Sequence, residues 1–123
     1  LDQNNRIPNT SHVLDNQIKT IILCKSTLNV GKENCIFEVI DFDQNVAQQI
    51  IAVLFKHQIQ SVIIEGGRQT LQTFIDEKCW DEARVFSGKV SFSTGIKAPI
   101  IEKNQCENFL IGTDELIICR NHD

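Results

Sequence analysis

The sequence predicts an α/β fold in three layers, with a mixed, mainly parallel sheet, flanking helices and a C-terminal antiparallel hairpin. Three observations predict this class. Two continuous apolar runs, residues 20–24 and 61–65, are typical of strands buried on both faces, as in a parallel sheet. Apolar residues at helical spacing lie between and after these runs. Two short apolar stretches around Gly112 indicate a closing hairpin.

The first half of the chain is expected to hold two strands and a helix. Polar residues 4–16 predict an opening loop, and residues 35–40 predict a strand after the first run. Residues 41–43 offer two aspartates as helix N-caps, and the helix that follows should end at about His57. Its apolar residues recur at helical spacing at Val46, Ile50, Ile51 and Leu54. The order strand, helix, strand implies parallel pairing through a right-handed crossover.

The second half continues this alternation and then closes with antiparallel strands. The run at residues 61–65 ends before Gly66 and Gly67, and a second helix follows with Leu71, Phe74 and Ile75 on one face. A strand is expected at residues 82–86 and a loop at residues 88–99. The two strands of the hairpin are expected at residues 109–111 and 115–119.

Composition excludes several classes of protein. The chain has 123 residues, the length of one domain, with 41% hydrophobic residues, as in an ordinary globular protein. Sixteen acidic residues outnumber twelve basic ones, so a nucleic-acid-binding protein with a wholly basic surface is excluded and no nucleic-acid partner is expected. No apolar stretch approaches the roughly 20 residues that span a membrane, and the N-terminus lacks the pattern of a secretory signal.

The five cysteines are widely spaced and contain no C-x-x-C pair, so no metal site is expected. Cys24 and Cys119 lie in apolar runs, where cysteine behaves as a small buried hydrophobe. We therefore expect all five to be reduced thiols of a cytoplasmic protein.

The segment from Glu65 into the second helix contains the residues best suited to bind a ligand. In open α/β sheets, ligands bind at the carboxyl ends of strands, and glycines there let a ligand approach the backbone. A helix N-terminus presents unpaired N–H groups and a partial positive charge that suit a phosphate. Arg68, Gln69 and Thr70 could add side-chain donors. Two simpler interpretations stay open: the glycine pair only makes a tight turn, and Glu65 is only a surface carboxylate.

Further motifs resemble one family. The sequence is similar to the C-terminal reductase domain of the bifunctional riboflavin-biosynthesis deaminase/reductase, and the resemblance spans nearly the whole chain. It is carried by Glu65-Gly66-Gly67 with Leu71 and Phe74, by residues 80–86 (WDEARVF), by residues 95–99 (GIKAP) and by residues 1–8.

The resemblance implies a dihydrofolate-reductase-like fold and the NADPH-dependent reduction of 5-amino-6-(5-phosphoribosylamino)uracil, a phosphorylated pyrimidine, to its ribitylamino product. It implies that Glu65 binds substrate. It implies NADPH contacts at Gly66, Gly67, Arg68, Gln69, Thr70 and Leu71. Asp2 follows an expected strand end, and from this position we expect it to approach the cofactor weakly. No residue of the chain is assigned as catalytic, because the cofactor would supply the hydride.

The resemblance also implies a homodimer and a longer parent. The family's deaminase domain and the first part of its reductase domain are not matched, so residues 1–123 are expected to be the C-terminal part of a longer domain that is inactive alone. Two alternatives stay open. One is a non-catalytic nucleotide-binding or association module, and the other is a related pterin or dihydrofolate reductase.

Overall fold

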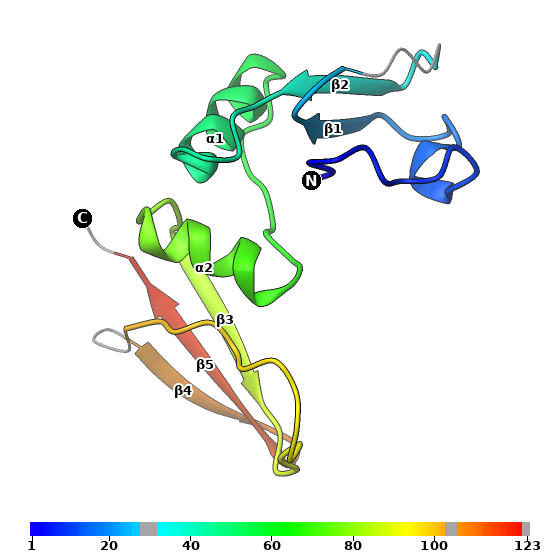
Figure 1. The fold of residues 1–123 in the computed structure, drawn as a ribbon. Coiled ribbons are helices and arrows are strands. Elements are labelled where there is room, and N and C mark those ends of the chain that lie inside the picture. The colour runs from blue at the N-terminus through cyan, green and yellow to red at the C-terminus, as the bar shows by residue number, and fades with distance from the viewer. Residues whose placement is uncertain (28–31, 103–105, 122–123) are drawn as a thin grey trace. The chain divides into compact units, whose positions relative to one another are not determined.

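The computed structural model describes residues 1–27, 32–102 and 106–121. The chain divides into two compact units, Leu1–Val62 and Ile63–Asp123, and each is described by itself (Figure 1). In the described ranges no helix has the length and apolar character needed to cross a membrane.

The first unit is built on a pair of parallel strands. Strand β1 (Thr20–Cys24) pairs in parallel with β2 (Cys35–Val39), so that Ile22 lies opposite Phe37. The chain start follows the other edge of β1, where the Asp2 N–H donates to the Leu23 carbonyl at 2.8 Å. A 3-10 helix, η1 (His12–Leu14), adds Leu14 to a core with Ile22 and Cys35. Both strands lie where the apolar runs predicted them.

Helix α1 (Val46–Lys56) follows β2 and buries Ala47, Ile50 and Val53, three residues on one helical face. The prediction of an aspartate N-cap is wrong, because the cap is Asn45 and no side chain caps the helix. Asp41 instead accepts a hydrogen bond from the Asp43 N–H at 2.9 Å. Gln49 anchors the entry to the helix through both the N–H and the carbonyl of Asp41, each at 2.8 Å.

A small ionic cluster joins β2 to the end of α1. The carboxylate of Glu38 accepts hydrogen bonds from Lys56 Nζ at 2.8 and 2.9 Å and lies 2.6 Å from His57 Nε2. The Glu38 and His57 side chains are only 15% and 14% exposed. The hydrogen bonds from Lys56 and then His57 lower the pKa of Glu38 below its usual value of 4.5.

The cluster predicts a loss of stability in acid. Because Glu38 binds a proton less readily when folded than when unfolded, its contribution is fully present above pH 4.5 and is lost as the pH falls through the lower folded-state pKa. Replacing Glu38→Gln should lower the free energy of unfolding by about 1–2 kcal/mol at neutral pH and flatten its slope in acid. Denaturant titrations followed by circular dichroism at several pH values measure this. If the free energy of unfolding of Glu38→Gln depended on pH in acid as that of the native protein does, Glu38 would not be the group responsible.

The second unit holds a helix and a three-stranded antiparallel sheet. Helix α2 (Arg68–Asp76) precedes β3 (Glu82–Ser87), and β4 (Cys106–Ile111) and β5 (Asp114–Arg120) form the closing hairpin. The sheet order is β3-β5-β4, with β5 in the centre (Figure 1). Gly112, at a φ of 61°, provides the left-handed conformation of the two-residue hairpin turn.

The α/β class is confirmed, and so are both helices, the strand after α2 and the terminal hairpin. The described strands form two separate sheets, a parallel pair and an antiparallel triplet, rather than one mainly parallel sheet. The strand expected at residues 61–65 is not formed: no strand in the described part of the chain pairs with it. A run of apolar residues becomes a strand only where a neighbour satisfies its N–H and C=O groups.

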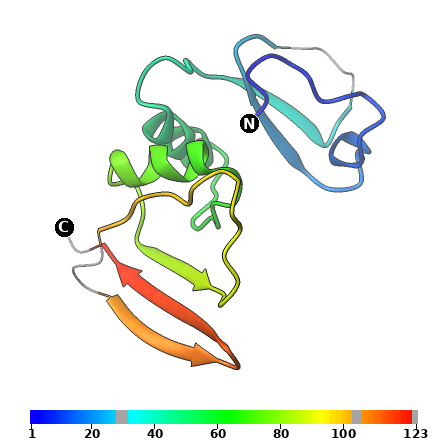
Figure 2. The same cartoon turned by 60° about the horizontal axis from the view of Figure 1, so that its bottom comes forward.

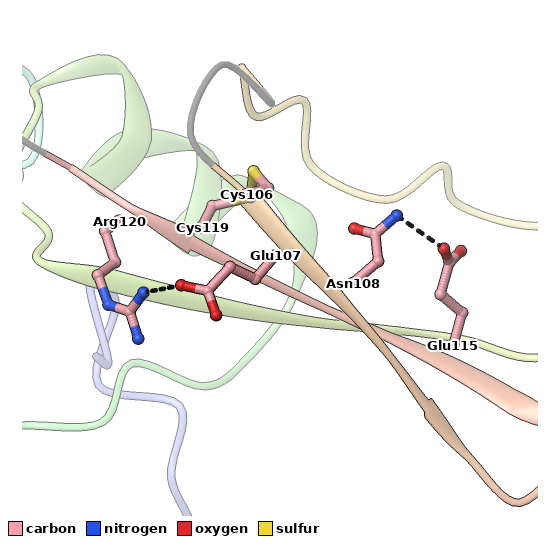
Figure 3. The surroundings of a disulfide bond; sticks show 6 residues. All are labelled: Cys106, Glu107, Asn108, Glu115, Cys119 and Arg120. Atoms are coloured by element: carbon pink, nitrogen blue, oxygen red, sulfur yellow. Dashed lines mark hydrogen bonds and ion pairs between the residues drawn. A yellow bond between two sulfur atoms is a disulfide. The ribbon is translucent and has the colours of Figure 1, made fainter.

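A disulfide bond joins the two strands of the hairpin. Cys106 lies directly opposite Cys119 in the register, and the two sulfur atoms are bonded (Figure 3). The pair is flanked by cross-strand contacts from Arg120 to Glu107 at 2.6 Å and from Asn108 to Glu115 at 3.1 Å. The prediction of five reduced thiols is therefore wrong for these two residues, while Cys24, Cys35 and Cys79 are free.

The disulfide has a direct chemical test. Alkylation of the denatured protein should modify three thiols before reduction and all five afterwards, as counted by mass spectrometry. Reduction of the bond, which closes a loop across a separation of 13 residues, should lower the free energy of unfolding by about 2–3 kcal/mol. Five thiols modified before reduction would show that the bond is not formed.

Candidate functional site: the start of helix α2

The two glycines before α2 have different structural roles. Gly66 has a φ of 139°, a conformation that side chains rarely allow, so the turn requires glycine there. Gly67 has an ordinary extended backbone, with φ −71° and ψ 164°, and it is the N-cap of α2. A Cβ atom at Gly67 would meet no atom within 4 Å. The first glycine therefore shapes the chain, and the second leaves open space at the helix start.

No side chain caps the N-terminus of α2, so its first N–H groups keep their partial positive charge available. The next residue, Arg68, is half-buried, and its guanidinium forms no ion pair with any residue in the described ranges. Gln69 is exposed, whereas Thr70 and Leu71 are half-buried. The start of α2 thus combines a helix N-terminus with an arginine that has no ion-pair partner there, two features that attract an anion.

An open groove of about 630 Å³ lies along α2. Its walls come from the helix start, from the next turns of the helix and from the loop after β3, and they consist of Gly67, Arg68, Gln69, Gln72, Thr73, Asp76 and Ile96. One end of the groove is cationic and the other carries the carboxylate of Asp76. Ile96 adds apolar surface from the loop, as in sites that combine apolar contacts with polar anchors.

The structure brings three of the predicted cofactor residues to this groove: Gly67, Arg68 and Gln69. Gly66 shapes the turn beside it, and Thr70 and Leu71 lie in the first turn of α2 without lining it. Glu65 is exposed just before the glycines and makes no hydrogen bond in the described part of the chain. Its carboxylate is free to accept hydrogen bonds from a ligand.

Asp2 lies in the first unit. Its two carboxylate oxygens accept hydrogen bonds from the N–H groups of Arg6, at 2.7 Å, and Ile7, at 2.9 Å. These bonds, that of Ile7 first, lower its pKa below the usual 3.8. Asp2 therefore stabilises the turn after the chain start. A contact of Asp2 with a cofactor stays a prediction.

Four residues of the groove were missed by sequence reasoning: Gln72, Thr73, Asp76 and Ile96. Gln72 lies four residues after Arg68 and so shares its helical face, a spacing that could have identified it. Ile96 belongs to a loop without regular structure, and no local pattern indicates that this loop returns to α2. Figure 2 shows the loop, coloured yellow to orange, passing beside α2 on its way to β4. Among the described residues, no cluster of three potential metal ligands was found.

Comparison with known proteins identifies the family. The model of the RibD C-terminal domain matches residues 1–95. The chain belongs to the RibD C-terminal domain family. The matched range includes Asp2 and the whole segment from Glu65 to Leu71, so the start of α2 lies inside the family's own pattern. No curated protein matches the sequence.

A solved structure shows the same fold. The chain is similar to Acinetobacter baumannii RibD, form 2, with a TM-score of 0.71 over 95% of this chain and 17% sequence identity. It spans only 35% of that protein's length. At this identity the likeness confirms the fold that the family resemblance implies, a dihydrofolate-reductase-like α/β domain.

Proposed function

We propose that this chain belongs to an NADPH-dependent reductase of riboflavin biosynthesis and that the groove at the start of α2 holds the cofactor. Family membership and fold support a reductase-type domain. The observation that carries the cofactor assignment is the open space at Gly67 beside an uncapped helix N-terminus and the guanidinium of Arg68.

The residues of the groove fit a dinucleotide phosphate. The N–H groups at the start of α2 donate to phosphate oxygens, and the guanidinium of Arg68 neutralises their charge. Gln69 offers further donors at the same end of the groove. Gly67 lets the cofactor approach the backbone, because a side chain there would project into the groove. When bound, NADPH supplies a hydride, and the chain itself binds and orients the reactants.

We assign the substrate, 5-amino-6-(5-phosphoribosylamino)uracil, to the side of Glu65. An exposed carboxylate without a hydrogen bond in the described part of the chain suits the N–H donors of an aminouracil. The proposal keeps the homodimer and the longer parent enzyme that the family resemblance implies. It also keeps a cytoplasmic location, now supported only by the three free thiols Cys24, Cys35 and Cys79. Sedimentation of the protein tests the homodimer.

Titration of nucleotides into the protein tests the cofactor assignment. The chain has one tryptophan, Trp80, four residues beyond the end of α2, so energy transfer from Trp80 to the reduced nicotinamide reports binding. We expect saturable binding of NADPH, followed by its oxidation when substrate is added to the parent enzyme. Binding without oxidation would favour a nucleotide-binding module over a reductase. Absence of binding would contradict the proposal.

Replacing Arg68→Gln should weaken NADPH binding about tenfold, because a charge-assisted hydrogen bond is worth about 1.5–3 kcal/mol when buried and less at a partly exposed site. The matched control is Arg84→Gln on β3, which is outside the groove and loses only an exposed ion pair with Glu82. The same titration compares the two variants. Equal effects of both would show that Arg68 acts only through net charge.

A further inference from the structure

The side chain of Gln72 joins α2 to the loop after β3. Its Nε2 donates to the carbonyl of Ile100 at 3.1 Å, and its Oε1 accepts from the Ile100 N–H at 2.8 Å. The same Nε2 also donates to Asp76 Oδ1 at 2.8 Å, which fixes the amide plane from the helix side. The amide of Gln72 therefore pairs with one residue of the loop as a neighbouring strand would.

Burial does little to hold most of this loop. Four of its large apolar residues are exposed, Val90 by 81%, Phe92 by 88%, Ile96 by 89% and Ile100 by 69%, and Ile101 is half-buried. Two hydrogen bonds between Gln72 and Ile100 join the loop to α2. Ile96 lies four residues before Ile100, so these two hydrogen bonds hold the loop to the helix close to Ile96.

We propose that Gln72 is a positioning residue that holds the loop against α2 and thereby sets the second wall of the cofactor groove. This inference rests on the proposed function, since it assigns the groove to NADPH. Gln72 acts through Ile100 on Ile96, the loop residue that lines the groove together with the residues of α2. Its side chain is engaged by the loop and by Asp76, which leaves the cofactor's phosphates to Arg68 and the helix N-terminus.

The chemistry of the amide gives a graded set of variants. Gln72→Leu removes both the donor and the acceptor. Gln72→Glu keeps the acceptor for the Ile100 N–H, but when ionised it has no donor for the Ile100 carbonyl. Protonation of the new carboxyl group restores that donor. The charged groups near this position in the chain are Asp76 and Arg68 along the helix and Lys97 and Glu102 in the loop. The contact with Asp76 favours the neutral form of the new carboxyl group.

The first measurement needs no nucleotide. Hydrogen exchange of the Ile100 amide and tryptic cleavage after Lys97 report how often the loop leaves the helix. Both rates should rise about tenfold in Gln72→Leu, because two hydrogen bonds are lost. Asp76→Ala is the matched control: it removes the helix-side bond and leaves both bonds to Ile100. Unchanged rates in Gln72→Leu would overturn the inference.

The second measurement is the Kd for NADPH of the folded variants relative to the native protein at the same pH. We expect an increase of about five- to fiftyfold for Gln72→Leu and a smaller one for Gln72→Glu at about pH 7.5. At about pH 5.5 the Gln72→Glu variant should return to within about twofold of the native protein. A merely structural role predicts no such recovery.

The outcomes separate the two proposals. A loosened loop in Gln72→Leu with unchanged NADPH affinity, or no recovery of Gln72→Glu in acid, would overturn the role of Gln72 alone. Absence of NADPH binding in the native protein would overturn the proposed function, and with it the groove's assignment to the cofactor.

Discussion

Replacing Gly67→Val is expected to weaken NADPH binding by at least about tenfold while leaving the protein folded. The residue has an ordinary extended backbone, and a Cβ there meets no atom within 4 Å, so the branched side chain fits the chain itself. Because Gly67 lines the groove, we expect the valine side chain to occupy space in it. The loss of glycine as N-cap should cost no more than about 1 kcal/mol of folding free energy. Titration with NADPH and thermal unfolding of the same samples measure both quantities.

The neighbouring glycine is the matched control. Gly66→Val places a branched residue at a φ of 139°, so it should destabilise the protein by about 1–3 kcal/mol. The two variants are thus expected to separate folding from binding within one dipeptide. An unchanged NADPH affinity in a folded Gly67→Val protein would contradict the assignment of the groove to NADPH. Equal loss of stability in both variants would show that Gly67 serves the turn only.

The second large effect is expected on turnover. Glu65→Gln in the parent enzyme should lower turnover of the ribosylamino-uracil substrate about ten- to a hundredfold, the range for losing a charged hydrogen bond. NADPH affinity should stay nearly unchanged, because Glu65 does not line the groove. Stability should also stay unchanged, since the exposed side chain has no hydrogen bond in the described part of the chain.

Steady-state kinetics with substrate and NADPH varied in turn distinguish the roles of Glu65. A fall in turnover with an unaltered NADPH dependence supports substrate binding. A parallel loss of NADPH affinity would move Glu65 into the cofactor site, and its assignment to the substrate would be wrong.

Sequence patterns predicted the elements well where local periodicity alone decides them. Helices α1 and α2 and strands β1 and β2 follow from spacing within each segment. The face predicted for α1 is only partly right, because the helix buries Ile50 together with Ala47 and Val53 and leaves Ile51 44% exposed. The run at residues 61–65 shows the limit of such patterns, because its apolar character is that of a strand but a strand also needs a partner. No local pattern reports whether a partner is present.

The disulfide could have been predicted from the sequence, but it was not. Gly112 and Thr113 form a two-residue turn, and that turn fixes the register in which Cys106 faces Cys119. The first hairpin strand was predicted to start at Phe109, three residues too late, so Cys106 was not placed on it. An earlier start would have put both cysteines opposite each other.

The site was predicted in part for a similar reason. Gly67, Arg68 and Gln69 are contiguous in sequence, so the strand-to-helix pattern identified them together. Ile96 comes from a loop about thirty residues later, and that loop is joined to α2 by the hydrogen bonds between Gln72 and Ile100. Long-range contacts of this kind have no local sequence signal.

The most direct test of the central claim is to map the bound cofactor by amide chemical shifts. Saturating NADPH should shift the amides of Gly67, Arg68 and Gln69 at the start of α2, together with that of Ile96 across the groove. The amides of the hairpin turn at Gly112 and Thr113 are the internal reference and should stay in place. Shifts confined to residues outside the groove, with the start of α2 unaffected, would contradict the account.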